Sequence, residues 1–85
     1  MAAYQVEILR RVQKQLASCP RDVRERLTAA IRELGGAPRP QGCAKLMGRD
    51  GWRIRVGDHR VLYVVNDRSL RVVVVDVGHR KEVYR

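Results

Sequence analysis

Apolar residues recur along the first part of the chain with two periods. A short strand is predicted near the N-terminus by three apolar positions that alternate with polar ones, Tyr4, Val6 and Ile8. A first helix is predicted by apolar residues at helical spacing, Val12, Leu16 and Cys19. A second helix is expected to begin at Pro20, which suits a first helical turn, and to end at Gly35-Gly36. Its apolar stripe consists of Val23, Leu27, Ala30, Ile31 and Leu34.

A long loop follows over residues 37–51. It is predicted by its prolines and glycines, Pro38, Pro40, Gly42 and Gly48. Three residues within it are expected to attach the loop to the core, namely Lys45, Leu46 and Met47.

From Trp52 onward the apolar period is two. Residues 52–56 alternate between apolar side chains and the arginines Arg53 and Arg55, which predicts a strand. Gly57-Asp58 then predicts a two-residue hairpin turn of type II′, because glycine stands at its first central position. Residues 61–65 are nearly all apolar, as expected for a central strand covered on both faces. Residues 66–69 predict the next turn, and residues 70–77 a last apolar strand.

The order of these elements is a strand, two helices and three antiparallel strands. It predicts an α+β fold in which an N-terminal strand precedes a helical hairpin and a three-stranded antiparallel meander. The helices are expected to pack on one face of the small sheet. Because 85 residues support only one thin core, residues 1–85 are expected to form a single domain.

Length and composition exclude several classes of protein. The sequence has no stretch of about 20 apolar residues, so no membrane span is expected. The N-terminal residues lack the basic-then-apolar layout of a signal peptide, which predicts a cytoplasmic location. Cys19 and Cys43 are too few for a disulfide framework, and their surroundings have no zinc-ligand spacing.

The charge of the chain is strongly unbalanced. Eighteen Lys and Arg residues against nine Asp and Glu residues give a net charge of +9. Such an excess indicates a polyanionic partner, which is a nucleic acid, a membrane surface or an acidic protein. Arg greatly outnumbers Lys, and this favours phosphate binding because a guanidinium group can hold two oxygens at once.

The predicted hairpin brings several of these arginines together. A two-residue turn at Gly57-Asp58 places Arg55 directly opposite Arg60, with Arg53 two residues along on the same face. Like charges in cross-strand register destabilise a sheet by about 0.2–1 kcal/mol. The arrangement is therefore typical of a site where a phosphate supplies the missing negative charge. The alternative is a solvated face on which the arginines point apart.

Other catalytic chemistry has little support in the sequence. His59 and His79 are the only histidines, and the acidic residues are scattered without a pair at metal-ligand spacing. No metal or other cofactor is expected. The sequence also lacks a phosphate-binding glycine-rich loop and a recognisable nucleophile–base arrangement. If the chain is an enzyme, its substrate has to supply the nucleophile, and RNA does so with its 2′-hydroxyl group.

Two segments resemble a known family. They are residues 45–63 (KLMGRDGWRIRVGDHRVLY) and residues 77–85 (VGHRKEVYR). Together with the preceding helical hairpin they resemble the RelE/ParE superfamily of bacterial and archaeal toxins, and the likeness covers essentially the whole chain. What the resemblance implies is a RelE-like fold and a toxin of a toxin–antitoxin pair. RelE-type members cut mRNA in the ribosomal A site without a metal, leaving a cyclic phosphate.

The resemblance also implies site residues. The basic cluster and C-terminal tyrosine of RelE-type members fall here on Arg53, Arg55, Arg60, Arg80 and Tyr84. In these roles Tyr84 acts on the 2′-hydroxyl, Arg55 and Arg60 hold the phosphate, and Arg80 assists the leaving oxygen. RNA contacts are expected from five further residues, Lys45, Arg49, His79, Lys81 and Arg85. Arginine stands where lysine is frequent at positions 53 and 55, and because arginine is a poor proton donor, His79 is an alternative for proton transfer.

The expected partners follow from the same resemblance. They are an acidic RelB-like antitoxin and the ribosome with its mRNA, with no membrane and no small-molecule cofactor. Two alternatives stay open. One is a ParE-like toxin that inhibits DNA gyrase without cutting nucleic acid, and the other is a non-catalytic module that binds RNA or the ribosome.

Overall fold

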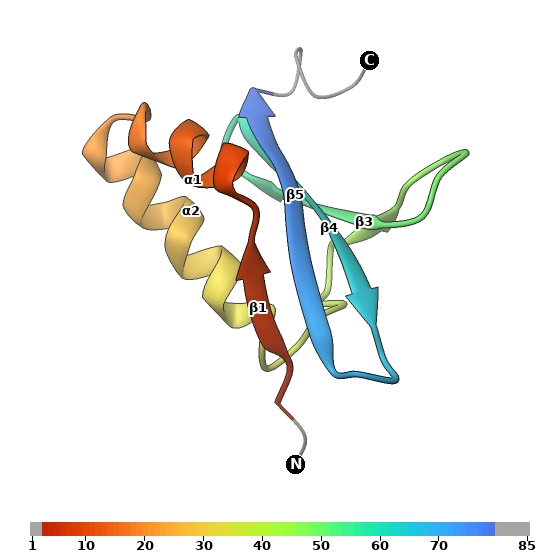
Figure 1. Cartoon of the computed structure of the whole chain (residues 1–85). Helices are drawn as coiled ribbons and strands as arrows, with labels where there is room; N and C mark the ends of the chain where they lie inside the picture. The colour runs from red at the N-terminus through yellow and green to blue at the C-terminus, as the bar shows by residue number, and fades with distance from the viewer. Residues whose placement is uncertain (1–2, 80–85) are drawn as a thin grey trace.

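The computed structural model describes residues 3–79. It contains one five-stranded sheet with the strand order β1-β5-β4-β3-β2 and two helices on one side of it (Figure 1). The elements are β1 (Gln5–Ile8), α1 (Arg10–Ala17), α2 (Arg21–Glu33), β2 (Ala44–Lys45), β3 (Trp52–Val56), β4 (His59–Asn66) and β5 (Arg71–His79). The predicted α+β fold is confirmed, including the helical hairpin on one face of the sheet and the antiparallel meander β3-β4-β5.

Several boundaries of the predicted elements differ from the structure; for example, α1 ends before Cys19, and β5 extends to His79, beyond residue 77. Pro20 is the N-cap of α2 rather than part of its first turn. The loop over residues 37–51 contains β2, which is antiparallel to the start of β3. Leu70 lies in the turn before β5, with φ of +56°, so the last strand starts one residue later than predicted.

The prediction that Met47 attaches the long loop to the core is wrong. The Met47 side chain is 93% exposed, whereas Leu46 is half-buried and lies near Gly51. Met47 and Gly48 are at the tip of the connection between β2 and β3, and such a tip is too far from the sheet to bury a side chain.

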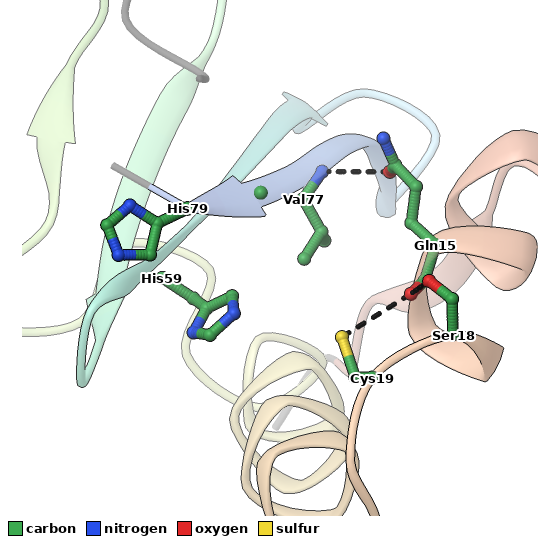
Figure 2. A pocket seen from close by; sticks show the side chains of 7 residues that line it. Gln15, Ser18, Cys19, His59, Val77 and His79 are labelled. Atoms are coloured by element: carbon green, nitrogen blue, oxygen red, sulfur yellow. Dashed lines mark hydrogen bonds between the residues drawn. The ribbon is translucent and has the colours of Figure 1, made fainter. Parts of the chain in front are cut away.

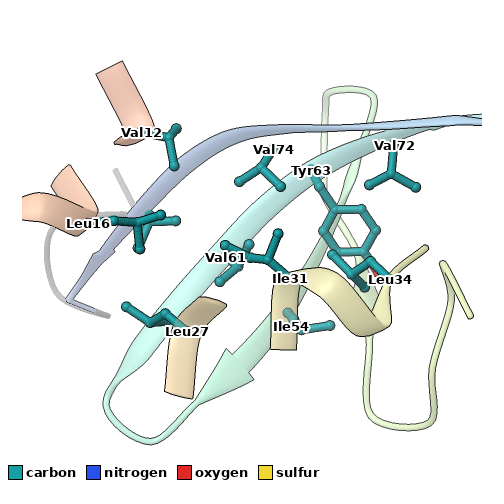
Figure 3. Close-up of a cluster of buried hydrophobic side chains, with 11 residues drawn as sticks. Val12, Leu16, Leu27, Ile31, Leu34, Ile54, Val61, Tyr63, Val72 and Val74 are labelled. Carbon is teal, nitrogen blue, oxygen red and sulfur yellow. The ribbon is translucent and has the colours of Figure 1, made fainter. Parts of the chain in front are cut away.

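The apolar stripes of the two helices meet the sheet in one core (Figure 3). Leu27 and Ile31 of α2 share this core with Val61 and Tyr63 of β4, and all four are at most 1% exposed. Because successive residues of a strand point to opposite faces, this burial assigns each position of the meander to a face. Residues in register with Val61 and Tyr63 point toward the helices, and their neighbours point away.

The end of β5 is held in place by α1. The register shifts between the pairs Leu62–Asp76 and Tyr63–Val74, which leaves Val75 without an opposing residue on β4. The Arg11 guanidinium donates two hydrogen bonds to the Val75 carbonyl, at 2.6 and 3.0 Å. The Gln15 side chain donates to Asp76 and accepts from the Val77 amide. These contacts fix the part of β5 that lies beside the β3–β4 hairpin. None of the described helices is long and apolar enough to cross a membrane.

Candidate nucleic-acid interface

The β3–β4 hairpin has the predicted turn and register. Gly57 has φ of +60° and Asp58 a negative φ, as a type II′ turn requires. Arg55 pairs with Arg60, and Arg53 pairs with Leu62. Because Ile54 and Val61 point toward the helices, all three arginines belong to the opposite face of the sheet, which the helices leave uncovered. The predicted arginine cluster on one face is therefore present.

The two opposed arginines have different environments. Arg60 is only 5% exposed, whereas the Arg55 side chain is exposed. On its other side Arg60 pairs with Gly78, which has no side chain, so neither register neighbour of Arg60 is acidic. A charge held away from water interacts more strongly with an approaching anion, because the local dielectric is lower. The pair thus combines a buried fixed cation with an exposed one that can move toward a phosphate.

The histidines lie at the same end of the sheet but on the other face. His59 pairs with His79, and their rings are 6.0 Å apart between centroids at an interplanar angle of 73°. They line a pocket of about 190 Å³ together with residues of α1 and of the turn that follows it (Figure 2). His79 is therefore grouped with His59 and the helices rather than with the arginine cluster, so this arrangement gives no support to His79 as the proton donor at the arginines.

Lys45 and Arg49 are also separate from the arginine cluster. Lys45 pairs with Trp52 and shares its face, and the Lys45 ammonium lies 5.9 Å from the centroid of the Trp52 ring. Arg39 approaches the same ring at 5.3 Å. Arg49 is exposed in the connection between β2 and β3. The four C-terminal candidates, Arg80, Lys81, Tyr84 and Arg85, lie outside the described residues.

A second pocket adjoins the arginine cluster, and it was not expected from the sequence. It has a volume of about 460 Å³ and is lined by Gln41, Gly42, Ala44, Arg53, Ile54 and Arg55. The loop that forms one wall is held at Arg39, whose guanidinium makes two hydrogen bonds to Asp67, at 2.6 and 3.2 Å. Asp67 also accepts a hydrogen bond from Tyr4 at 2.6 Å. No pattern in the sequence links these residues, because 28 residues separate Arg39 from Asp67.

Asp67 and Tyr63 both have shifted pKa values, and both make contacts that hold the loop in place. The hydrogen bonds from Arg39 and Tyr4 lower the pKa of Asp67, so its carboxylate is ionised at neutral pH. Burial raises the pKa of Tyr63, whose hydroxyl donates a hydrogen bond of 2.6 Å to the Pro38 carbonyl. Tyr63 is thus a neutral anchor for the loop and not a general base. Among the described residues there is no group of three or more His, Cys, Asp or Glu side chains that could hold a metal ion.

Comparison with known proteins identifies the family. A family model described as the ParE toxin of the type II toxin–antitoxin system parDE matches residues 6–84. The chain belongs to the RelE/ParE superfamily of toxins. Among curated proteins no sequence matches significantly.

Solved structures of RelE toxins resemble more than nine-tenths of this chain. The RelE–RelB complex of Pyrococcus horikoshii OT3 has 30% sequence identity and a TM-score of 0.84, over 95% of this chain and 99% of that one. The isolated RelE toxin of E. coli has 32% identity and a TM-score of 0.78, over 96% and 92% of the two chains. RelE in the intact E. coli RelBE complex has 30% identity and a TM-score of 0.78, over 91% and 96%. The protein is therefore a toxin of a RelBE-like toxin–antitoxin system.

Proposed function

We propose that this toxin is an endoribonuclease that cuts mRNA in the ribosomal A site, in the cytoplasm, without a metal ion. The observation that carries the proposal is the register of the β3–β4 hairpin, which puts Arg53, Arg55 and Arg60 on the helix-free face. A sheet selected for stability alone has no reason to oppose two arginines, whereas a phosphate between them turns repulsion into attraction.

The reaction is an internal transfer at phosphorus. The 2′-oxygen attacks the adjacent phosphorus, the bond to the 5′-oxygen breaks, and the products are a 2′,3′-cyclic phosphate and a 5′-hydroxyl. One proton leaves the 2′-hydroxyl and one is gained by the 5′-oxygen, so no other reactant is consumed. Arg55 and Arg60 stabilise the extra negative charge on the phosphate as it forms. Tyr84 orients the 2′-hydroxyl and Arg80 assists the leaving oxygen.

The same cations are the proposed contact for an acidic RelB-like antitoxin. Two of the matched RelE structures, one from Pyrococcus horikoshii and one from E. coli, are complexes with RelB, and this chain carries a net charge of +9. An acidic segment that covers Arg55 and Arg60 would neutralise the pair and block the phosphate site at once. Co-expression with an acidic protein from a neighbouring gene is expected to yield a tight complex that assembles more slowly as salt rises.

The test is primer extension on translating ribosomes. Wild-type toxin is expected to produce cuts in the A-site codon, and a single 2′-deoxy sugar 5′ to the cut is expected to abolish them. Arg55→Ala and Tyr84→Phe should reduce cleavage, whereas Arg68→Ala, which removes one exposed arginine from the β4–β5 turn, should not. Undiminished cleavage of the 2′-deoxy substrate would rule out the 2′-hydroxyl mechanism.

A second candidate function is inhibition of DNA gyrase, because the family model that matches the chain is that of the ParE toxin. It predicts loss of supercoiling activity when gyrase is incubated with the toxin, and intact mRNA in the ribosome assay. Ribosome binding without either effect would indicate a non-catalytic RNA-binding module.

A further inference from the structure

The pocket between the loop at Gln41 and the edge of β3 combines three kinds of polar group. The exposed Gln41 side chain offers an amide donor and an amide acceptor. Arg53 and Arg55 supply positive charge. At about 460 Å³ it is larger than the histidine pocket, of about 190 Å³, and lies in the range of small-molecule sites.

The backbone of Arg55 adds a further donor and acceptor. In a two-residue hairpin Val56 and His59 exchange hydrogen bonds, so Arg55 and Arg60 form the next, non-hydrogen-bonded pair. The N–H and C=O groups of Arg55 therefore point away from β4, toward the outer edge of β3. Strand β2 covers this edge only at Trp52 and Arg53. The outward backbone groups of Arg55 thus face the side of the pocket.

This short edge is unsuited to an added strand. Beyond β2 it consists of residues 54–56, and within them only Arg55 turns its backbone groups outward. Added strands usually form several ladder bonds over three or more residues of their own. The available groups are the backbone N–H and C=O of Arg55, the amide of Gln41 and the guanidinium groups of Arg53 and Arg55. These groups are better suited to a single planar ring that carries a phosphate.

The wall that contains Gln41 is held in a fixed position. On one side of Gln41, Arg39 is bound to Asp67 and the Pro38 carbonyl accepts a hydrogen bond from Tyr63. On the other side, β2 starts at Ala44 and pairs with Arg53. Gly42 adopts φ of +94°, which lets the chain bend between these two attachments. A loop that is fixed at both ends loses less conformational entropy when it binds a ligand. The Gln41 amide can therefore discriminate between ligands.

We propose that this pocket binds the adenine base of an RNA nucleotide next to the bound phosphate, and that the Gln41 amide recognises the edge of this base by hydrogen bonding. Adenine presents a donor and an acceptor side by side, and a glutamine amide is their bidentate complement. Arg53 and Arg55 hold the attached phosphate, whatever the base. This inference rests on the proposed function, since it takes single-stranded RNA as the ligand.

Binding of short RNAs tests the pocket separately from cleavage. Fluorescence anisotropy at low salt is measured with four pentanucleotides, UUAUU and its U, C and G counterparts at the central position. Wild-type protein should prefer adenine by about tenfold, the scale of one bidentate base contact. Gln41→Leu should bind all four with the affinity that wild type has for the least favoured base. Arg55→Ala should weaken all four by a similar factor and keep the preference.

Gln5→Leu is the matched control, because Gln5 is an exposed glutamine on β1, at the opposite edge of the sheet. It should leave both affinity and preference unchanged. The inference is overturned if wild type does not prefer adenine, or if Gln41→Leu keeps the preference. It is also overturned if Gln41→Leu weakens only the complex with an acidic antitoxin, which would assign the pocket to that partner. A preference that Gln41→Leu abolishes stands even if no cleavage occurs on ribosomes, so the two proposals can fail independently.

Discussion

Removing Arg55 should separate function from stability. Arg55 is exposed and lies directly opposite the buried Arg60. Cross-strand like charges cost about 0.2–1 kcal/mol. Because the Arg55 side chain is in water, we take the lower part of this range and expect Arg55→Ala to raise the free energy of unfolding by a few tenths of a kcal/mol. Arg55→Glu should raise it further, since it places an opposite charge across from Arg60.

The dependence of these stability differences on salt tests whether charge repulsion causes them. The Debye length falls from about 10 Å at 0.1 M salt to about 3 Å at 1 M. Chemical denaturation is therefore measured for wild type, Arg55→Ala and Arg55→Glu, at low salt and at about 1 M salt. The differences in the free energy of unfolding should be present at low salt and become small at high salt. Arg68→Ala, which removes an exposed arginine from the β4–β5 turn, should show little change under either condition.

Activity should change in the opposite direction. Losing one preorganised charge stabiliser lowers a rate by about ten- to a thousand-fold, or about 1.4–4 kcal/mol. Single-turnover cleavage on ribosomes measures this loss for Arg55→Ala. If Arg55→Ala instead lowers the free energy of unfolding by more than about 1 kcal/mol, Arg55 is a structural residue and the electrostatic reasoning is wrong.

Three further predictions concern the core and the loop. Leu27 is 0% exposed, so Leu27→Ala should lower the free energy of unfolding, measured by urea denaturation, by about 2–5 kcal/mol. A decrease of less than about 1 kcal/mol would contradict the packing of α2 on the sheet. Tyr63→Phe removes the hydroxyl that donates to the Pro38 carbonyl, and it should lower the free energy of unfolding by about 0.5–1.5 kcal/mol. Amide hydrogen exchange in the loop should become faster; unchanged exchange would show that the loop does not depend on this hydrogen bond. Asp67, whose pKa is lowered by its hydrogen bond to Arg39, should stabilise the fold above its unfolded pKa of about 3.9, and this contribution should disappear as pH falls through the lower folded value. The difference in melting temperature between wild type and Asp67→Asn should accordingly be present at pH 7 and shrink below about pH 4; a constant difference across this range would remove the ionic explanation.

The hairpin shows what the sequence can predict at this site. A two-residue turn fixes the register of its strands, so Gly57-Asp58 is sufficient to place Arg55 opposite Arg60. The alternating apolar residues then decide which face these arginines occupy. Both signals are local, and the structure confirms them. The assignment of catalytic and RNA-binding roles to the individual residues stays a prediction.

Features that depend on distant parts of the chain could not be predicted in the same way. Strand β2 has two residues and forms only because Trp52 and Arg53 lie beside it. The parallel pairing of β1 with β5 joins segments that are far apart in the sequence, and nothing in either segment specifies the partner. Arg60 is buried, which its own sequence context does not indicate. The Gln41 pocket was missed for the same reason, because its walls come from a loop and an edge that meet only in the fold.

In the proposed function, the arginine pair links the activity of the toxin to its inhibition by an antitoxin. The turn and the core fix Arg55 directly opposite Arg60 in the folded protein. Under the proposed function, a phosphate of RNA and a carboxylate of an antitoxin would both gain binding energy from these two positive charges. Arg55→Ala is therefore expected to stabilise the free toxin and to weaken the binding of both ligands. The charge arrangement that makes the proposed site active is thus the one that makes it susceptible to neutralisation by an acidic partner.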